Sequence, residues 1–464
     1  MINVIAFLIL FIFVFSISVY AVGDPLAMPN NKFGIGILSP ESDIPEAASL
    51  VDANGDWGYV VIVIKKSERN VDRWQNVFHL LSKNHLIPIV RIATDLDSKG
   101  YWQRPTDEDA HSWADFLSKL YWPTKDHFVQ VYNEVNNANE WGGQVDAASY
   151  TKELGKTIDA LRTKGLDFFV LGSPMDLSLE TTSTSLSPST FFQTMSSVDP
   201  DIFKKLDGWA SHSYPNPGFS ASPLAGGRTS VSGFSWELAQ VALYLDGKKL
   251  PVFITETGWQ RKDTGTSGVD ETQIAAYYKT AFNQVWNDQR VAAVAPFVFD
   301  YPDGQFNQFS FKTKDEKVLG RKYYSYFDTI RDLLKVKGEP EREDLTGDIK
   351  VDIAKVIIPD RNSDVNLKVK NTGNYIWNIT DGFKIDLVGP DLKTNDVKFS
   401  KSEIYPGEDA TVNFKISSIR EGILPLDIKV ADGDKVLGEK TINVESRSYL
   451  SLILEAIARS LPHL

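Results

Sequence analysis

Cysteine is absent from the 464 residues of this chain. Its absence excludes disulfides, thiolate chemistry and zinc sites built on cysteine, and it leaves the redox compartment undetermined. Histidine is scarce as well: the six residues show no close metal-ligand spacing such as His-Glu-x-x-His. We therefore expect neither a catalytic metal nor another cofactor.

Basic residues are fewer than acidic ones, so the formal net charge is −12. A charge of this sign repels phosphate backbones, so nucleic acid is not an expected partner and a neutral polymer is easier to accommodate. Aromatic residues are abundant, with 11 Trp and 17 Tyr. Rings in this number leave some free for ligand contact, although any single ring can equally belong to the core.

One long apolar run stands at the start of the chain, where residues 4–22 carry no charge. Two small-residue sites, ending at Ala21 or at Gly23, suit a signal peptidase. The run is also long enough to span a bilayer, and no Lys or Arg precedes it. We expect export, with residues 1–23 as a signal peptide or an N-terminal membrane anchor. The product is then secreted or anchored on the outer face of the cytoplasmic membrane, with membrane association through residues 4–22 in the second case.

Residues 24–335 alternate short, β-branched apolar runs with longer segments of helical period, which is typical of βα units around a parallel sheet. Eight strands favour an α/β fold of the (β/α)8 TIM barrel type. An open doubly wound sheet is the alternative, but no glycine-rich phosphate turn follows the first run. The expected strands are 33–37, 57–64, 86–93, 128–134, 168–173, 208–214, 252–256 and 292–299.

A second, smaller unit is expected after a charged linker at residues 336–348. Residues 349–445 alternate in the manner of strands and lack helical periods, which predicts a small all-β sandwich. The segment from Asn371 to Trp377, with the later Pro406-Gly-Glu and Glu421-Gly-Ile, resembles immunoglobulin-like modules appended to bacterial exported enzymes.

The tail at residues 446–464 predicts an amphipathic helix. We expect its apolar face to dock onto the protein itself rather than onto a membrane surface, because the polar face carries only two Arg and one Glu. The apolar face contains Leu450, Ile453, Leu454, Ile457 and Leu461.

Two of the expected strands end in glutamate, at Asn133-Glu134 and at Glu256. The carboxyl ends of barrel strands form the active site, and strands four and seven lie on opposite sides of the ring, so the two carboxylates can flank one bond of a substrate. Glycosidic cleavage needs one carboxyl group as acid and another as anion. A structural ion pair is the alternative for either glutamate alone, but coincidence at both strands is much less expected.

The Asn133-Glu134 pair, His212-Ser-Tyr214 and Thr-Glu256-Thr-Gly-Trp together resemble the clan A glycoside hydrolases, which include retaining cellulases, mannanases and xylosidases. The resemblance covers residues 33–330. It implies hydrolysis of β-glycosidic bonds in a polysaccharide or oligosaccharide by double displacement. Glu256 would be the nucleophile and Glu134 the acid/base, with a β-linked glycan as partner.

Neighbouring side chains complete the expected site. Asn133 offers an amide to the sugar 2-hydroxyl, and the resemblance implies that Tyr214 holds the nucleophile. His212 is expected to contact the acid/base or the substrate, with a satisfied core histidine as the alternative. Arg91 can hydrogen-bond Glu256, or can equally be a buried structural cation.

Two features depart from the family. Its arginine commonly follows the second strand, whereas Arg91 lies on the third run. Many members end strand eight with a Trp platform, and here Phe299 or Tyr301 takes its place, or else Trp259 and Trp141 provide the stacking surface. The last two are equally expected as loop anchors.

Two other functions are open to such a chain. An inactive glycan-binding or cell-surface scaffold on the same barrel is the first, and an adhesin built around the sandwich is the second. The presence of both glutamates favours the enzyme.

Overall fold

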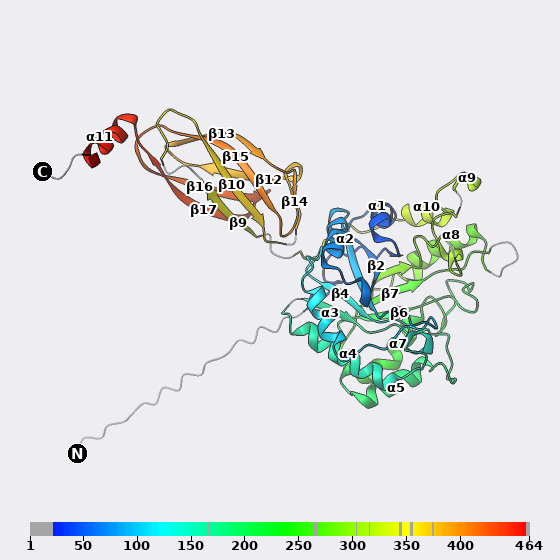
Figure 1. Cartoon of the computed structure of the whole chain (residues 1–464). Coiled ribbons are helices and arrows are strands. Elements are labelled where there is room, and N and C mark those ends of the chain that lie inside the picture. Colours follow the sequence, from blue (N-terminus) through cyan, green and yellow to red (C-terminus); the bar gives the residue numbers. More distant parts are fainter. Residues whose placement is uncertain are drawn as a thin grey trace, which may run out of the picture.

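The computed structural model describes residues 22–460, apart from 166, 263–267, 303, 315, 343–345, 353–355 and 374. Most of the leader expected at residues 1–23 thus lies outside the described residues. The described chain consists of a mixed α/β unit with parallel strands, followed by antiparallel sheets and a terminal helix (Figure 1).

All eight strands expected in the α/β unit are present. They are β1 (Gly34–Ile37), β2 (Gly58–Lys65), β3 (Leu86–Ala93), β4 (His127–Val131), β5 (Phe168–Leu171), β6 (Trp209–His212), β7 (Val252–Thr257) and β8 (Val291–Pro296). At least one helix follows each strand. The helices are α1 (Pro40–Val51), α2 (Val71–Lys83), α3 (Asp109–Leu117), α4 (Ala147–Arg162), α5 (Pro188–Val198), α6 (Ile202–Lys205), α7 (Gly233–Val241), α8 (Glu271–Thr280), α9 (Glu316–Leu319) and α10 (Ser325–Arg331).

The parallel strands form two sheets in chain order, β1 to β5 and β6 to β8. Single parallel bridges connect the two sheets at both of their edges. One bridge pairs Leu171 with Gly208, between β5 and β6, and the other pairs Phe33 with Val294, between β1 and β8. The backbone N–H of Phe299 also donates to Gly36 O at 2.8 Å. The edges of the two sheets therefore meet.

Side-chain alternation separates two layers of apolar packing. One set of strand residues faces the helices; the other forms an inner cluster that includes Ile87, Ile89, Phe128, Phe169 and Phe253. Because both faces are covered, strands such as β2 and β3 are almost entirely apolar. Helix α2 shows the outer packing: it buries Trp74, Val77, Phe78 and Leu81 on one stripe.

In the residues that the structure describes, the second unit contains strands and one 3-10 turn before its terminal helix. A four-stranded sheet has the order β13-β15-β10-β9, and a three-stranded sheet has the order β12-β16-β17. Alternating burial along β10 sends Val365, Leu367 and Val369 into a shared core with Trp377. The strands are β9 (Gly347–Asp352), β10 (Ser363–Asn371), β11 (Trp377–Asn378), β12 (Phe383–Val388), β13 (Leu392–Phe399), β14 (Glu403–Ile404), β15 (Asp409–Ser418), β16 (Gly422–Asp432) and β17 (Lys435–Ser446).

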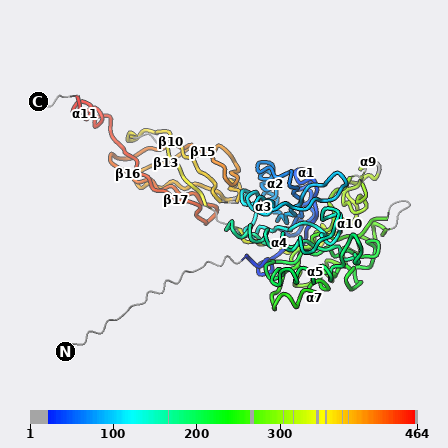
Figure 2. The backbone as a smooth tube through the Cα atoms, turned by 60° about the horizontal axis from the view of Figure 1, so that its bottom comes forward, coloured from blue at the N-terminus to red at the C-terminus, as the bar shows by residue number. Residues whose placement is uncertain are grey.

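The segment expected as a linker is attached to the α/β unit. Gly338 N donates to Asp56 O at 3.0 Å, and Lys125 N donates to Glu341 O at 2.8 Å. The β unit itself contacts α2, where Lys83 pairs with Glu403 at 3.0 Å. The second unit therefore lies beside the α2 side of the first, as Figure 2 shows from another direction.

The terminal helix α11 (Tyr449–Ser460) lies at the far end of the β unit from the α/β unit (Figure 1). Its apolar face does not dock onto the rest of the protein as expected, because Leu450, Ile453, Leu454 and Ile457 are each at least 50% exposed. Leu461 lies outside the described residues. Among the helices that the structure describes, none has both the length and the apolar character needed to cross a bilayer.

A buried carboxyl group on α7 should make stability depend on pH. Glu237 is fully buried, accepts a hydrogen bond from Ser211 Oγ, and has its pKa raised by burial to about 8. The unfolded chain loses this proton near pH ~4.3, so the folded state loses stability as the pH rises from there to about 8.

In Glu237→Gln, we expect the free energy of unfolding to fall less steeply with pH than in wild type, by up to ~1.4 kcal/mol per pH unit. Urea unfolding between pH 5 and 8 measures both slopes. The exposed Asp159→Asn is the control and should keep the wild-type slope. Identical slopes for wild type and Glu237→Gln would contradict the assignment.

Candidate active site

Strand alternation turns two polar side chains into the inner space. On β3, Ile87 and Ile89 belong to the inner cluster, and Arg91 is the next residue on that face. On β6, Ala210 is in the inner cluster and His212 follows two residues later. Both side chains therefore enter the inner space at the carboxyl ends of their strands.

Glu256 reaches the same space through an irregularity in β7. Phe253 lies in the inner cluster and Ile254 in the outer one, so strict alternation would send Glu256 outward. The pairing of β7 shifts register against β6 before His212 and against β8 between Ile254 and Thr257. Such a bulge re-aims a side chain, and here it turns the carboxylate inward.

Glu134 lies in the loop after β4, because the strand ends at Val131, earlier than expected. Tyr132 and Glu134 have φ values of +67° and +35°, a left-handed backbone that non-glycine residues rarely adopt. Strain of this kind persists where surrounding contacts hold it. Asn136 supplies such contacts: its Oδ1 accepts from Asp176 N at 3.1 Å, and its Nδ2 donates to Asp176 O at 3.0 Å and to Leu186 O at 3.1 Å.

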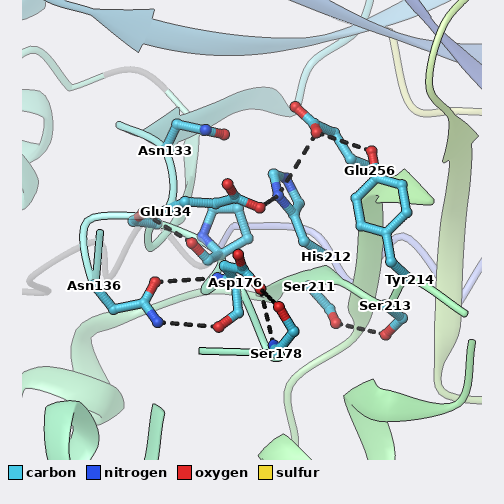
Figure 3. A network of polar contacts seen from close by, with 12 residues as sticks. Asn133, Glu134, Asn136, Asp176, Ser178, Ser211, His212, Ser213, Tyr214 and Glu256 are labelled. Carbon is cyan, nitrogen blue, oxygen red and sulfur yellow. Dashed lines mark hydrogen bonds and ion pairs between the residues drawn. The ribbon is translucent and has the colours of Figure 1, made fainter. Parts of the chain in front are cut away.

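The side chains of Glu134, His212, Tyr214 and Glu256 converge on one network, as Figure 3 shows. His212 Nδ1 lies 2.8 Å from Glu134 Oε1 and 3.7 Å from Glu256 Oε2. Tyr214 Oη donates to Glu256 Oε2 at 3.1 Å. Arg91 Nη1 donates to Glu256 Oε1 at 2.8 Å and to Asn133 Oδ1 at 2.7 Å. Six residues expected from the sequence thus lie together. Arg91 does lie on the third strand, β3, and it contacts Glu256 directly.

The environments of the two glutamates differ. Burial raises the pKa of Glu134, as do the carboxylates of Asp176 and Glu256, although the hydrogen bond with His212 opposes the shift. Burial by itself would lower the pKa of His212, but the carboxylates of Glu256 and Glu134 outweigh it and raise the pKa. Burial also raises the pKa of Tyr214, so its hydroxyl remains a donor to Glu256.

Both glutamates can be reached from outside. The side chain of Glu134 is 22% exposed and that of Glu256 is 16% exposed. Burial favours the protonated form of Glu134, while Glu256 accepts hydrogen bonds from a guanidinium and a phenol. The arrangement can therefore donate a proton and stabilise positive charge at one place.

The expected stacking residues are the main correction. Trp141, Trp259 and Phe299 are 1%, 2% and 0% exposed, so their faces are covered by protein and not open to a sugar. Trp141 packs on Tyr132 and Tyr150. Trp259 packs among Tyr277, Tyr278 and Trp286, and Phe299 among Tyr323, Phe327 and the Lys312 ammonium. All three are core anchors.

The sequence analysis does not identify two other residues near the site, Phe297 and Glu140. Phe297, directly after β8, is partly exposed, and its ring centroid lies 5.6 Å from that of Phe306, which is itself 39% exposed. Phe309 joins this aromatic group to Tyr214, with ring centroids 6.2 Å apart. Glu140 approaches the network from the loop after β4 and lines a small pocket with Arg91 and Asn133. No pattern in the sequence distinguishes either residue from its neighbours.

The described residues contain no group of three or more His, Asp or Glu placed to hold a metal ion.

No family model and no curated protein matches the chain. Solved structures that resemble it include a family 39 glycoside hydrolase from the gut symbiont Bacteroides cellulosilyticus, with a TM-score of 0.46, 14% identity, and coverage of 84% of this chain and 81% of that chain. A family 128 endo-β-1,3-glucanase from Sorangium cellulosum has a TM-score of 0.41 and 12% identity, and the match covers 65% of this chain and 98% of that one. A CARDB domain from Pyrococcus furiosus has a TM-score of 0.17 and 17% identity, over 22% of this chain and 95% of that domain.

Asn136 provides a test of how the Glu134 loop is held. We expect Asn136→Ala to lower the free energy of unfolding by about 2–3 kcal/mol, because it leaves part-buried backbone groups of Asp176 and Leu186 without partners. Urea unfolding measures the change.

The neighbouring Asn137→Ala is the matched control, since Asn137 is partly exposed and accepts only from Asn139 N in the described network. Equal losses in the two variants would show that Asn136 has no special role.

Proposed function

We propose that the protein is an exported retaining hydrolase of β-glycosidic bonds in a polysaccharide or oligosaccharide, with Glu256 as nucleophile and Glu134 as acid/base. The observation that carries the proposal is the position of His212 Nδ1, 2.8 Å from a Glu134 oxygen and 3.7 Å from a Glu256 oxygen. Two carboxyl groups that share one neighbour at these distances face the same small space.

The same distances favour retention of configuration. Both oxygens lie close to His212 Nδ1, so the distance between them is at most the sum of those two distances. That sum only just reaches the lower limit of the ~6.5–9.5 Å separation found in inverting enzymes. Retaining enzymes need about 5–5.5 Å, because the second carboxylate itself attacks the sugar.

The reaction would proceed in two displacements. In the first, the Glu256 carboxylate bonds to the anomeric carbon, the glycosidic bond breaks, and Glu134 gives its proton to the departing oxygen. In the second, water attacks the anomeric carbon, Glu134 takes the proton of the water, and Glu256 leaves as carboxylate. Arg91 and Tyr214 hold the nucleophile in its attacking orientation through their hydrogen bonds.

We also propose the larger organisation on which this function rests. Residues 24–335 form a closed (β/α)8 barrel, supported by the bridges that connect its two sheets. Residues 336–348 connect it to an immunoglobulin-like sandwich at 349–445. Residues 1–23 direct export, and the protein is secreted or stays anchored on the outer face of the cytoplasmic membrane, where its partner is a β-linked glycan.

Removal of the nucleophile is the first functional test. Glu256→Ala should lower kcat on an aryl β-glycoside by more than about 10⁴-fold, and azide should partly restore turnover by attacking from the vacated face, giving the α-glycosyl azide. NMR identifies that product. Wild-type activity in Glu256→Ala would exclude the nucleophile assignment, and no turnover by wild type on a broad panel would favour a glycan-binding scaffold.

Removal of the acid should have a different signature. Glu134→Ala should lose about 10²–10⁴-fold on glycosides with poor leaving groups but much less on a dinitrophenyl glycoside, whose oxygen needs no proton. Azide should now intercept the glycosyl-enzyme and give the β-glycosyl azide. Equal losses on both substrates would show that Glu134 does not protonate the leaving group.

A further inference from the structure

A small pocket has Asn133 in its lining. It encloses about 10 Å³, which is room for one water- or hydroxyl-sized group. Its lining holds a third carboxyl group, Glu140, that neither displacement uses. The lining residues with polar or aromatic side chains are Arg91, Thr94, Trp102, Tyr132, Asn133 and Glu140.

Glu140 is fixed in place by two loops that bind each other. It is the last residue of the 3-10 turn η2 (Ala138–Glu140). Trp102, in the loop after β3, donates from its backbone N to Asn139 O at 2.8 Å and accepts from Gly142 N at 2.7 Å. Thr94 Oγ1 secures the same loop by donating to Gln103 O at 2.6 Å. The pocket is therefore formed before any ligand enters.

The polar groups in the pocket are only partly used by one another. Asn133 and Glu140 line the pocket together, and Asn133 Oδ1 accepts from Arg91. Arg91 Nε is buried and has no hydrogen-bond partner in the described part of the chain. An acceptor and an unused N–H donor at one small cavity match the needs of a hydroxyl group, which both donates and accepts.

We propose that Glu140 is a specificity-determining contact that binds a hydroxyl group of the sugar beside Asn133. The inference rests on the proposed function and narrows it, because an anionic carboxylate here repels uronic acids and sulfated sugars. The substrate is then a neutral β-linked glycan. Trp102, which is partly exposed, offers an aromatic face beside the same sugar.

The ionisation of Glu140 makes this contact sensitive to pH. Burial, with the nearby carboxylates of Glu134 and Glu256, raises the pKa of Glu140 to about 7, against the opposing charge of Arg91. A carboxylate accepts a hydrogen bond from a hydroxyl group more strongly than the neutral acid does. Substrate binding therefore tightens as the pH rises through that value.

The test compares KM and kcat for wild type, Glu140→Gln and the matched control Glu153→Gln. Glu153 on α4 is also buried, with its pKa raised by burial to about 7, but it does not line the pocket. Wild type and Glu153→Gln should show KM falling between pH 6 and 8. Glu140→Gln should show a flat KM, about tenfold above wild type at pH 8, with kcat changed less than threefold.

The substrates are neutral β-linked hexaoses of glucose, mannose, xylose and galactose. A loss of kcat in Glu140→Gln with unchanged KM would overturn the proposal, because it would mean that Glu140 acts only by positioning Arg91 and Asn133. Wild-type behaviour of Glu140→Gln would overturn it as well. If wild type hydrolyses none of these hexaoses but does hydrolyse a β-linked uronic acid hexaose, this inference fails and the proposed function stands. If it hydrolyses neither kind, the proposed function fails as well.

Discussion

The register shift in β7 is the constraint on which the site depends. Ile254 faces the outer core, so without the shift Glu256 would face outward as well. With the shift, its carboxylate meets a guanidinium from β3, a phenol from the segment after β6 and the imidazole of His212. Each of those groups comes from a strand end, so the parallel arrangement of the strands brings them together. A single local irregularity brings Glu256 into the cluster of side chains that we propose as the reaction centre.

The chemistry requires two carboxyl groups to behave differently, and their surroundings explain how they can. Glu256 accepts hydrogen bonds from two donors, Arg91 and Tyr214. Glu134 lies among carboxylates and apolar surroundings that raise its pKa, with His212 as its direct partner. The fold bears a cost for this arrangement, since Glu134 has a left-handed backbone and several charges are desolvated. Buried Asn136 helps to hold the strained loop.

The sequence predicted what depends on periodicity and on strand order. All eight strands are expected from the sequence, and the observed alternation along β3 and β6 turns Arg91 and His212 inward. The sequence does not reveal the features that depend on packing between distant segments. The early end of β4, the bulge at Glu256 and the burial of Trp141, Trp259 and Phe299 arise from contacts with other elements. Composition can show an excess of aromatic rings but cannot show which of them face solvent, so Phe297 was missed. The apolar face of α11 was expected to be covered, and no segment of the described chain covers it.

The central claim, that Glu256 bonds covalently to the sugar, can be tested directly by trapping. A 2-deoxy-2-fluoro β-glycoside with a good leaving group slows the second displacement more than it slows access to the intermediate. Intact-mass spectrometry of the inactivated protein should show one added fluoroglycosyl group, and peptide mapping should locate it on Glu256. An adduct on any other residue, or turnover of the reagent with inverted product and no adduct, would contradict the account.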